Sequence, residues 1–118
     1  MRRVVVTGLG CVTPVGNDVP TFWESLKAGK CGIGPITHFD TTEHKAKVAA
    51  EVKDFDPLQY MEKSDVRKFD VFCQYAMAAA TQAVEESGIK GTLPPERIGT
   101  YFGSGIGGMH TFAEEQKT

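Results

Sequence analysis

The chain has 118 residues, enough for one domain of ordinary size. It is 41% hydrophobic and 24% charged, a balance that excludes an intrinsically disordered chain. Thirteen Lys and Arg against fifteen Asp and Glu give a net charge of −2, so the sequence lacks the basic excess that nucleic-acid binding requires. No stretch approaches the roughly twenty apolar residues of a membrane span, so we expect no membrane partner.

The cysteines Cys11, Cys31 and Cys73 are irregularly spaced and form no Cys-x-x-Cys pair. They therefore predict neither a zinc site nor a disulfide framework, and they favour a reducing compartment. The apolar run after Met1 is too short for a signal peptide. We expect a cytoplasmic protein without metal or cofactor, in which no cysteine or histidine of this chain can be named as catalytic.

The predicted elements alternate between strands and helices. In chain order they are a buried strand over 3–7, a short helix opened by Asp18 and ended by Gly29, a loop over 30–42, a short strand over 46–52, a helical turn over 57–61, a long helix from Ser64 or Asp65 to Gly88, a connector over 91–96, a buried strand over 98–102 and an opening helix over 109–116. This order indicates an α/β fold with a parallel sheet. Two buried parallel strands need sheet neighbours, so we expect the chain to be a truncated part of a larger fold.

The predicted long helix has one apolar stripe at three- and four-residue spacing, which is expected to be buried. The stripe consists of Val66, Phe69, Cys73, Ala76, Met77, Ala80, Ala83 and Val84. Several of these residues, and the neighbouring Ala78 and Ala79, are small. Small side chains allow another stretch of backbone to approach the helix closely.

A glycine-rich turn follows the second buried strand. Gly103, Gly105 and Gly108 match the pattern G-x-G-x-x-G between a strand and a helix. The pattern is compatible with a dinucleotide-binding site, where the backbone approaches a pyrophosphate, but a tight structural turn is the favoured interpretation.

Three cations, Lys63, Arg67 and Lys68, surround the predicted start of the long helix. Cations in a first turn oppose the helix dipole. The simplest interpretation is a solvated face; the alternative is a docking site for an acidic or phosphorylated partner.

The motifs together resemble the N-terminal part of the elongating β-ketoacyl-acyl-carrier-protein synthases. The resemblance rests on collinear segments along the whole chain: Arg2–Gly10, Thr13–Asn17, Phe22-Trp23 with Leu26 and Gly29, Ile36–Thr41, Val52–Phe55, Arg67–Asp70, and Arg97–Gly99 leading into Gly103–Gly108. It is closest to the type II enzymes.

The resemblance implies a thiolase-like fold, layered α-β-α-β-α, built from two similar halves and working as a homodimer. Residues 1–118 would be the N-terminal part of the first half. The implied reaction is a decarboxylating Claisen condensation between an acyl thioester and a malonyl group on the acyl carrier protein. The nucleophilic cysteine, two histidines and a lysine of the family lie in motifs that this sequence lacks, so we expect the chain alone to be inactive.

Two sets of site residues follow from the resemblance. Ile106, with Gly105 and Gly107 beside it, would line the acyl-chain pocket and act as its gate. Arg67 and Lys68, with Lys63 less strongly indicated, would dock the acidic carrier protein.

Three other interpretations stay open. The chain could derive from a polyketide ketosynthase or a chain-length factor, which differ from fatty-acid enzymes mainly in residues absent here. A dinucleotide-binding oxidoreductase would bind NADH or NADPH saturably. A non-catalytic interaction protein would unfold cooperatively on its own, whereas we expect this chain to expose strand edges and to aggregate without a partner segment.

Overall fold

A computed structural model describes residues 1–117 of the chain. They fall into two compact units, which we describe separately. The α1 unit is Cys11–Phe55, and the α3 unit combines Met1–Gly10 with Asp56–Thr118. Among the described residues, no helix combines the length and the apolar character needed to cross a membrane.

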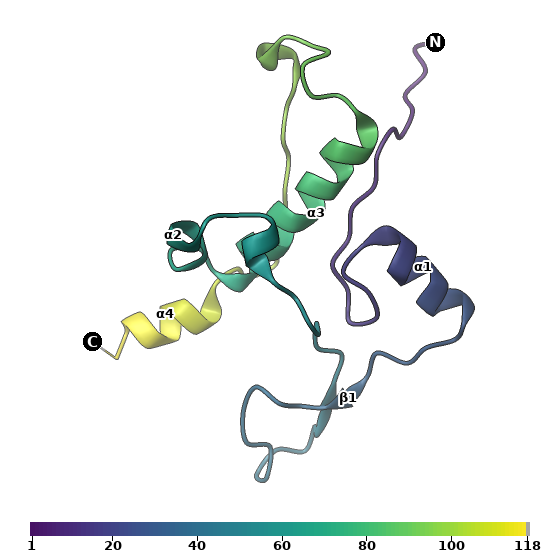
Figure 1. Ribbon diagram of the computed structural model, residues 1–118. Coiled ribbons are helices and arrows are strands. Elements are labelled where there is room, and N and C mark those ends of the chain that lie inside the picture. Colours follow the sequence, from purple (N-terminus) through teal and green to yellow (C-terminus); the bar gives the residue numbers. More distant parts are fainter. Residues whose placement is uncertain (118) are drawn as a thin grey trace. The chain divides into compact units, whose positions relative to one another are not determined.

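The α1 unit begins with a tight turn and the helix α1, Val19–Lys27 (Figure 1). The Asp18 carboxylate accepts a hydrogen bond of 2.7 Å from the Thr21 N–H, which satisfies one of the N–H groups left open at a helix start. Pro20 lies in the first turn, where its missing N–H costs nothing. Gly29 adopts a φ of 64° just after the helix. The predicted helix and both of its boundaries are confirmed.

A two-residue antiparallel ladder follows, formed by β1, Gly34–Pro35, and β2, Val48–Ala49. In its register, Gly34 lies opposite Ala49 and Pro35 opposite Val48. The prediction of a strand over 46–52 is confirmed in shortened form, whereas the prediction of a continuous loop over 30–42 is wrong at β1. The Ile36 N–H donates a hydrogen bond of 3.1 Å to the Lys47 carbonyl, which continues the backbone contact just beyond Pro35.

The α3 unit divides the predicted long helix into two. The helix α2 covers Lys63–Val66, and α3 covers Val71–Ser87. The predicted start at Ser64 or Asp65 is therefore wrong for the long helix, whereas its predicted end is confirmed. Gly88 follows α3 with a φ of 63°, the left-handed conformation that ends many helices.

Gln74 explains the break. Its buried side-chain amide donates hydrogen bonds to the carbonyl of Val66, at 3.1 Å, and to that of Phe69, at 2.9 Å. A helix end leaves such carbonyls without intrahelical partners, and this amide supplies donors for two of them. The helical periodicity of the sequence continues through 64–70, but a side chain from the next helix stabilises the interruption.

Of the remaining helical elements of the α3 unit, two were predicted and one, a 3-10 turn at the end of the predicted connector, was not. A 3-10 turn, Pro57–Gln59, follows Asp56, whose carboxylate accepts a bond from the Leu58 N–H. A second 3-10 turn, Pro95–Arg97, lies at the end of the predicted connector. The helix α4, Met109–Glu115, lies within the predicted opening helix.

The two predicted buried strands of this unit are not strands among the described residues. Residues 3–7 and 98–102 follow non-helical paths without a ladder partner (Figure 1). Their apolar side chains are exposed; Val4, for example, is 94% exposed. A strand is stabilised by hydrogen bonds to a neighbour, and the only ladder in the described residues belongs to the α1 unit.

The first of these segments continues into a close contact with α3. A Cβ built on Gly10 would lie 2.9 Å from the carbonyl carbon of Ala79, and one built on Gly8 would lie 2.8 Å from the backbone nitrogen of Ser87. The Leu9 N–H between them donates to the Glu86 carboxylate. The predicted close approach of a neighbouring backbone to the alanine-rich helix is confirmed.

Candidate functional site

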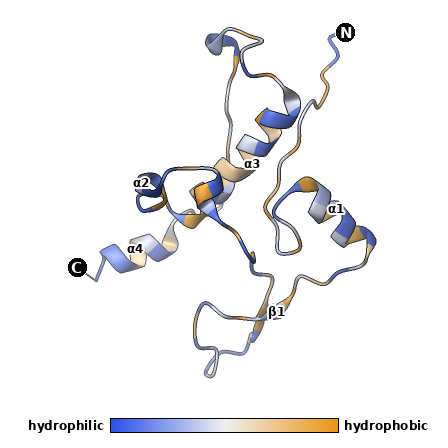
Figure 2. Cartoon of the chain, in the orientation of Figure 1, coloured by the Kyte–Doolittle hydropathy of each residue, from blue (hydrophilic) through white to orange (hydrophobic). Residues whose placement is uncertain are grey.

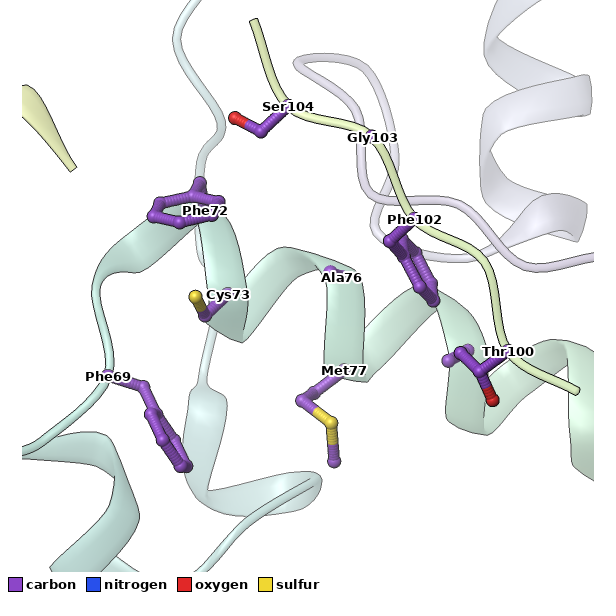
Figure 3. A pocket seen from close by; sticks show the side chains of 10 residues that line it. Phe69, Phe72, Cys73, Ala76, Met77, Thr100, Phe102, Gly103 and Ser104 are labelled. Atoms are coloured by element: carbon purple, nitrogen blue, oxygen red, sulfur yellow. The ribbon is translucent and has the colours of Figure 1, made fainter. Parts of the chain in front are cut away.

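An apolar pocket of about 570 Å³ opens along one face of α3 (Figure 3). Its lining comes from α3, from Phe69 just before it and from the segment that leads into the glycine-rich turn. The lining residues are Phe69, Phe72, Cys73, Ala76, Met77, Ala80, Thr100, Phe102, Gly103 and Ser104. Five of them belong to the predicted apolar stripe.

The stripe is not buried as predicted. Phe69, Met77 and Val84 are all exposed, and the stripe forms an open wall of the pocket instead. In Figure 2 the middle of α3 has apolar colours while α2 is the most hydrophilic helix of this unit. The periodicity identified the apolar face correctly, but residues 1–117 supply no layer that covers it.

The glycine-rich turn begins at this pocket and ends beside Phe72. Gly107 has a φ of 82° and faces the Phe72 ring, whose Cζ would lie 3.5 Å from a Cβ at this position. Gly105 is exposed, and Ile106 is 80% exposed. None of these three residues is part of the pocket lining.

The start of α4 lies against Asp70, the residue that precedes α3. The Thr111 hydroxyl donates a hydrogen bond to Asp70 Oδ1, and a Cβ built on Gly108 would lie 2.5 Å from Asp70 Cγ. A carboxylate in this position would repel a pyrophosphate, which disfavours the dinucleotide interpretation of the turn. Sequence reasoning missed Asp70, although an aspartate just before an apolar periodic run is a known signal for a helix start.

The three candidate docking cations lie on and after α2. Lys63 is its first residue, Arg67 is its C-terminal capping residue and Lys68 follows; all three are exposed. Arg67 and Lys68 thus lie near a helix C-terminus, where cations are favourable, and not in the first turn of the long helix as predicted. Among residues 1–117, none of the ion pairs involves them.

The cysteines are separate from one another. Cys73 lines the pocket, Cys31 is exposed and Cys11 is half-buried, and no disulfide joins them in the part of the chain that the structure describes. Burial raises the pKa of the Cys11 thiol, and the Asp18 carboxylate raises this pKa further. A raised pKa disfavours the thiolate that a nucleophile needs. Residues 1–117 also contain no cluster of three side chains suited to a metal ion.

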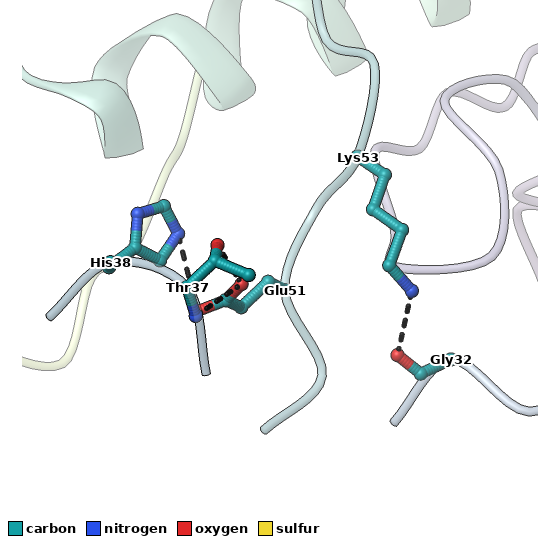
Figure 4. Close-up of polar contacts among 5 residues, drawn as sticks. All are labelled: Gly32, Thr37, His38, Glu51 and Lys53. Atoms are coloured by element: carbon teal, nitrogen blue, oxygen red, sulfur yellow. Dashed lines mark hydrogen bonds and ion pairs between the residues drawn. The ribbon is translucent and has the colours of Figure 1, made fainter. Parts of the chain in front are cut away.

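The α1 unit has a polar cluster around Glu51, which sequence reasoning also missed (Figure 4). The Thr37 hydroxyl and N–H donate to the Glu51 carboxylate at 2.7 and 3.0 Å, and His38 Nε2 lies 3.7 Å from Glu51 Oε1. These groups, the Thr37 hydroxyl first, lower the pKa of Glu51. The imidazole of His38 is mostly exposed and pairs with this carboxylate, so the cluster joins the two sides of the β1–β2 ladder.

Comparison with known proteins identifies the class of protein. Residues 1–118 match the family described as "Beta-ketoacyl synthase, N-terminal domain". The chain belongs to this family.

Individual relatives are consistent with that assignment. The chain is 53% identical over 110 residues to the 3-oxoacyl-[acyl-carrier-protein] synthase 2 of Coxiella burnetii, covering 92% of this chain and 26% of that protein. It is 40% identical over 116 residues to the enzyme of the same name from Synechocystis, covering 98% of this chain and 28% of the relative. The chain thus spans about a quarter of the length of these curated relatives.

A solved structure, "The ishigamide ketosynthase/chain length factor", superposes with a TM-score of 0.80 at 33% identity. The match covers 98% of this chain and 29% of the other. The predicted relationship to ketosynthases is confirmed in sequence and in fold.

Proposed function

We propose that this chain is the N-terminal segment of a β-ketoacyl-acyl-carrier-protein synthase that elongates fatty acids. The observation that carries the proposal is the family match along residues 1–118, together with 53% identity to a 3-oxoacyl-[acyl-carrier-protein] synthase. Residues 1–118 then form the N-terminal part of the first half of a layered α-β-α-β-α fold, in a cytoplasmic homodimer. The open apolar wall of α3 supports this assignment, because the other layers of such a fold would cover it.

The proposed reaction is a decarboxylating Claisen condensation. An acyl group is held as a thioester on a cysteine of the synthase. The malonyl thioester of the carrier protein loses carbon dioxide, its C2 carbanion attacks the acyl carbonyl, and the cysteine leaves as a thiolate. The products are a 3-oxoacyl thioester, longer by two carbons, and carbon dioxide. We assign none of these catalytic roles to Cys11, Cys31 or Cys73.

The direct test is condensation by the complete synthase that carries this segment. Purified enzyme with acyl- and malonyl-carrier protein should release carbon dioxide and form a 3-oxoacyl thioester in equal amounts. Decarboxylation without condensation would favour a chain-length-factor role, and products extended by several unreduced 3-oxo units would favour the polyketide alternative. Saturable binding of NADPH with no condensation would contradict the proposal.

Within this synthase, Ile106 would gate the acyl pocket, with Gly105 and Gly107 allowing the backbone to pass close to the acyl chain. The exposure of Ile106 supports this role, since its side chain is available to contact a ligand. Ile106→Phe should lower kcat/KM for the longest acyl chains by about tenfold or more, because one or two methylene groups lose their space. Ile33→Phe, at another exposed isoleucine, is the matched control. An unchanged chain-length profile in Ile106→Phe would contradict the gate.

Carrier-protein docking would use the cations of α2. Arg67 and Lys68 are exposed, and none of the ion pairs among residues 1–117 involves them. Lys63 lies one helical turn away. These cations are therefore available to an acidic partner. Arg67→Glu with Lys68→Glu should weaken binding of the carrier protein about tenfold at low salt and less at high salt, because exposed charges are screened. Lys45→Glu with Lys90→Glu makes the same charge change elsewhere and should have little effect. Equal effects of the two double variants would exclude a docking role for α2.

A further inference from the structure

Asp70 lies between two features of the proposed synthase. On its N-terminal side are the docking cations Arg67 and Lys68. Its carboxylate lies against the other feature, the end of the glycine-rich turn at Gly108, and accepts a hydrogen bond from the Thr111 hydroxyl in the first turn of α4. The residue is half-buried, although a lone carboxylate is usually exposed.

The contact places the Asp70 carboxylate against a residue that is near Ile106 in the sequence. Gly108 is two residues after Ile106, and Thr111 is in the first turn of α4. Phe72, two residues after Asp70, lies against Gly107, with its ring 3.5 Å from the position of a Cβ. The C-terminal end of the turn is therefore fixed against the start of α3 by one polar and one aromatic contact. Its middle, with Ile106, is exposed.

The polar contact joins a hydroxyl donor to a carboxylate acceptor. A hydroxyl that donates to a carboxylate makes a stronger hydrogen bond than one between neutral groups. The carboxylate also occupies the space where any side chain at position 108 would have to go. Among the described groups, Thr111 is the side-chain donor to Asp70. The Asp70–Thr111 pair therefore defines where the turn ends.

We propose that Asp70 and Thr111 are positioning residues for acyl-chain selectivity, acting through the turn that carries Ile106. This inference rests on the proposed function and goes beyond it by assigning a specificity role to two residues that do not contact the acyl chain. A gate discriminates between chain lengths only if its backbone is held in one position. When the pair is broken, the turn gains freedom and the synthase accepts chains that the wild type rejects.

The test compares kcat/KM of the complete synthase for a preferred and a rejected acyl chain length. In Thr111→Val, the ratio of the two values should fall about tenfold, the size expected when a charge-assisted hydrogen bond is lost. Thr111→Ser keeps the hydroxyl and should restore most of the wild-type ratio. The KM for malonyl-carrier protein should stay unchanged in both variants, because the docking cations are intact.

Two further variants separate positioning from general loss of structure. Thr92→Val removes another exposed threonine hydroxyl of the same unit, one that donates to the Ile89 carbonyl at 2.7 Å, and should leave the ratio unchanged. The double variant Asp70→Ala/Thr111→Val should be no less selective than the worse single variant, because both remove the same interaction. If Thr111→Val fails to fold, Asp70→Asn, which keeps the shape but loses the charge, should give a smaller fall in the same ratio.

The outcomes distinguish this inference from the proposed function. A wild-type synthase that does not condense would overturn the proposed function. If the wild type condenses but Thr111→Val lowers kcat/KM equally for all acyl chain lengths, only the positioning role is overturned. The same holds if Thr111→Val and Thr92→Val give the same ratio.

Discussion

The α1 unit and the α3 unit are stabilised in different ways. In the α1 unit, side chains bond to distant backbone: Lys53 Nζ donates to the Gly32 carbonyl at 3.2 Å, and the Asn17 side-chain amide donates to the Lys53 carbonyl at 2.8 Å. The buried Ser25 hydroxyl donates to the Val15 carbonyl. Each unit also packs glycine against a helix backbone, Gly16 against α1 and Gly10 against α3, but among the described residues only in the α3 unit does an apolar helix face line a large open pocket.

The difference shows which unit depends on further protein. These side chains satisfy three backbone carbonyls of the α1 unit from within the unit itself. The α3 unit leaves large apolar side chains exposed along residues 3–7 and on α3, and apolar surface that stays in water loses the stabilisation of about 25 cal/mol per Å² that its burial would give. Removing the protein segments that cover these side chains should therefore destabilise the α3 unit more than the α1 unit.

The largest expected effect concerns the chain on its own. We expect the purified 118-residue chain to bind a hydrophobic dye and to melt without a cooperative transition, since the α3 face has no cover. The same residues within the complete synthase should unfold cooperatively. A single sharp transition of the isolated chain, seen by both near- and far-UV circular dichroism, would mean that neither unit depends on further protein for its stability.

A smaller effect is expected where the α3 unit is tightly packed. Gly10→Ala should destabilise the complete synthase by about 1–3 kcal/mol, because the new methyl group overlaps the α3 backbone at Ala79. Gly99→Ala is the matched control, since a Cβ there meets no atom within 4 Å. The measurement is the denaturant midpoint. Equal midpoints for the two variants would exclude a close contact at Gly10.

The smallest effect is expected in the α1 unit and depends on pH. The pKa of Glu51 is lowered in the folded chain from its ordinary value of 4.5. Its contribution to stability is therefore complete above 4.5 and disappears as the pH falls through the lowered, folded value. Glu51→Gln should abolish this part of the acid destabilisation.

Amide hydrogen exchange at the β1–β2 ladder would measure the effect of Glu51→Gln. In the wild type, the protection of these amides should decrease once the pH is below about 4.5. In the variant, protection should be lower at neutral pH and should depend less on pH. Glu43→Gln removes an exposed carboxylate of the same unit as a control. If wild type and Glu51→Gln lose protection in parallel as the pH falls, the cluster around Glu51 does not contribute to the fold.

Local signals made the helix ends predictable. Asp18, Pro20 and Gly29 define α1 through the chemistry of caps, and Gly88 ends α3 through its left-handed conformation. The prediction of strands over 3–7 and 98–102 was wrong for the described residues, because a strand needs a hydrogen-bonded partner and no property of the segment itself provides one. The start of α3 was wrong because Gln74 binds carbonyls five and eight residues earlier.

The candidate site was predictable only in part, for a similar reason. The resemblance indicated Ile106 and the cations, and their exposure is compatible with both roles without testing them. The contact between Asp70 and Thr111 joins residues 41 positions apart, so no local pattern could indicate it. The apolar stripe of α3 was recognisable from its period, but whether it is covered depends on segments far from it in sequence.

The Gln74 amide also restricts how this region can change during evolution. One rigid group binds two carbonyls, those of Val66 and Phe69, so it fixes the number of residues between α2 and α3. Residues 67 and 68 can exchange one side chain for another without disturbing either bond, whereas an insertion or deletion there would break at least one. Related proteins should therefore vary in the charge of this segment while keeping its length.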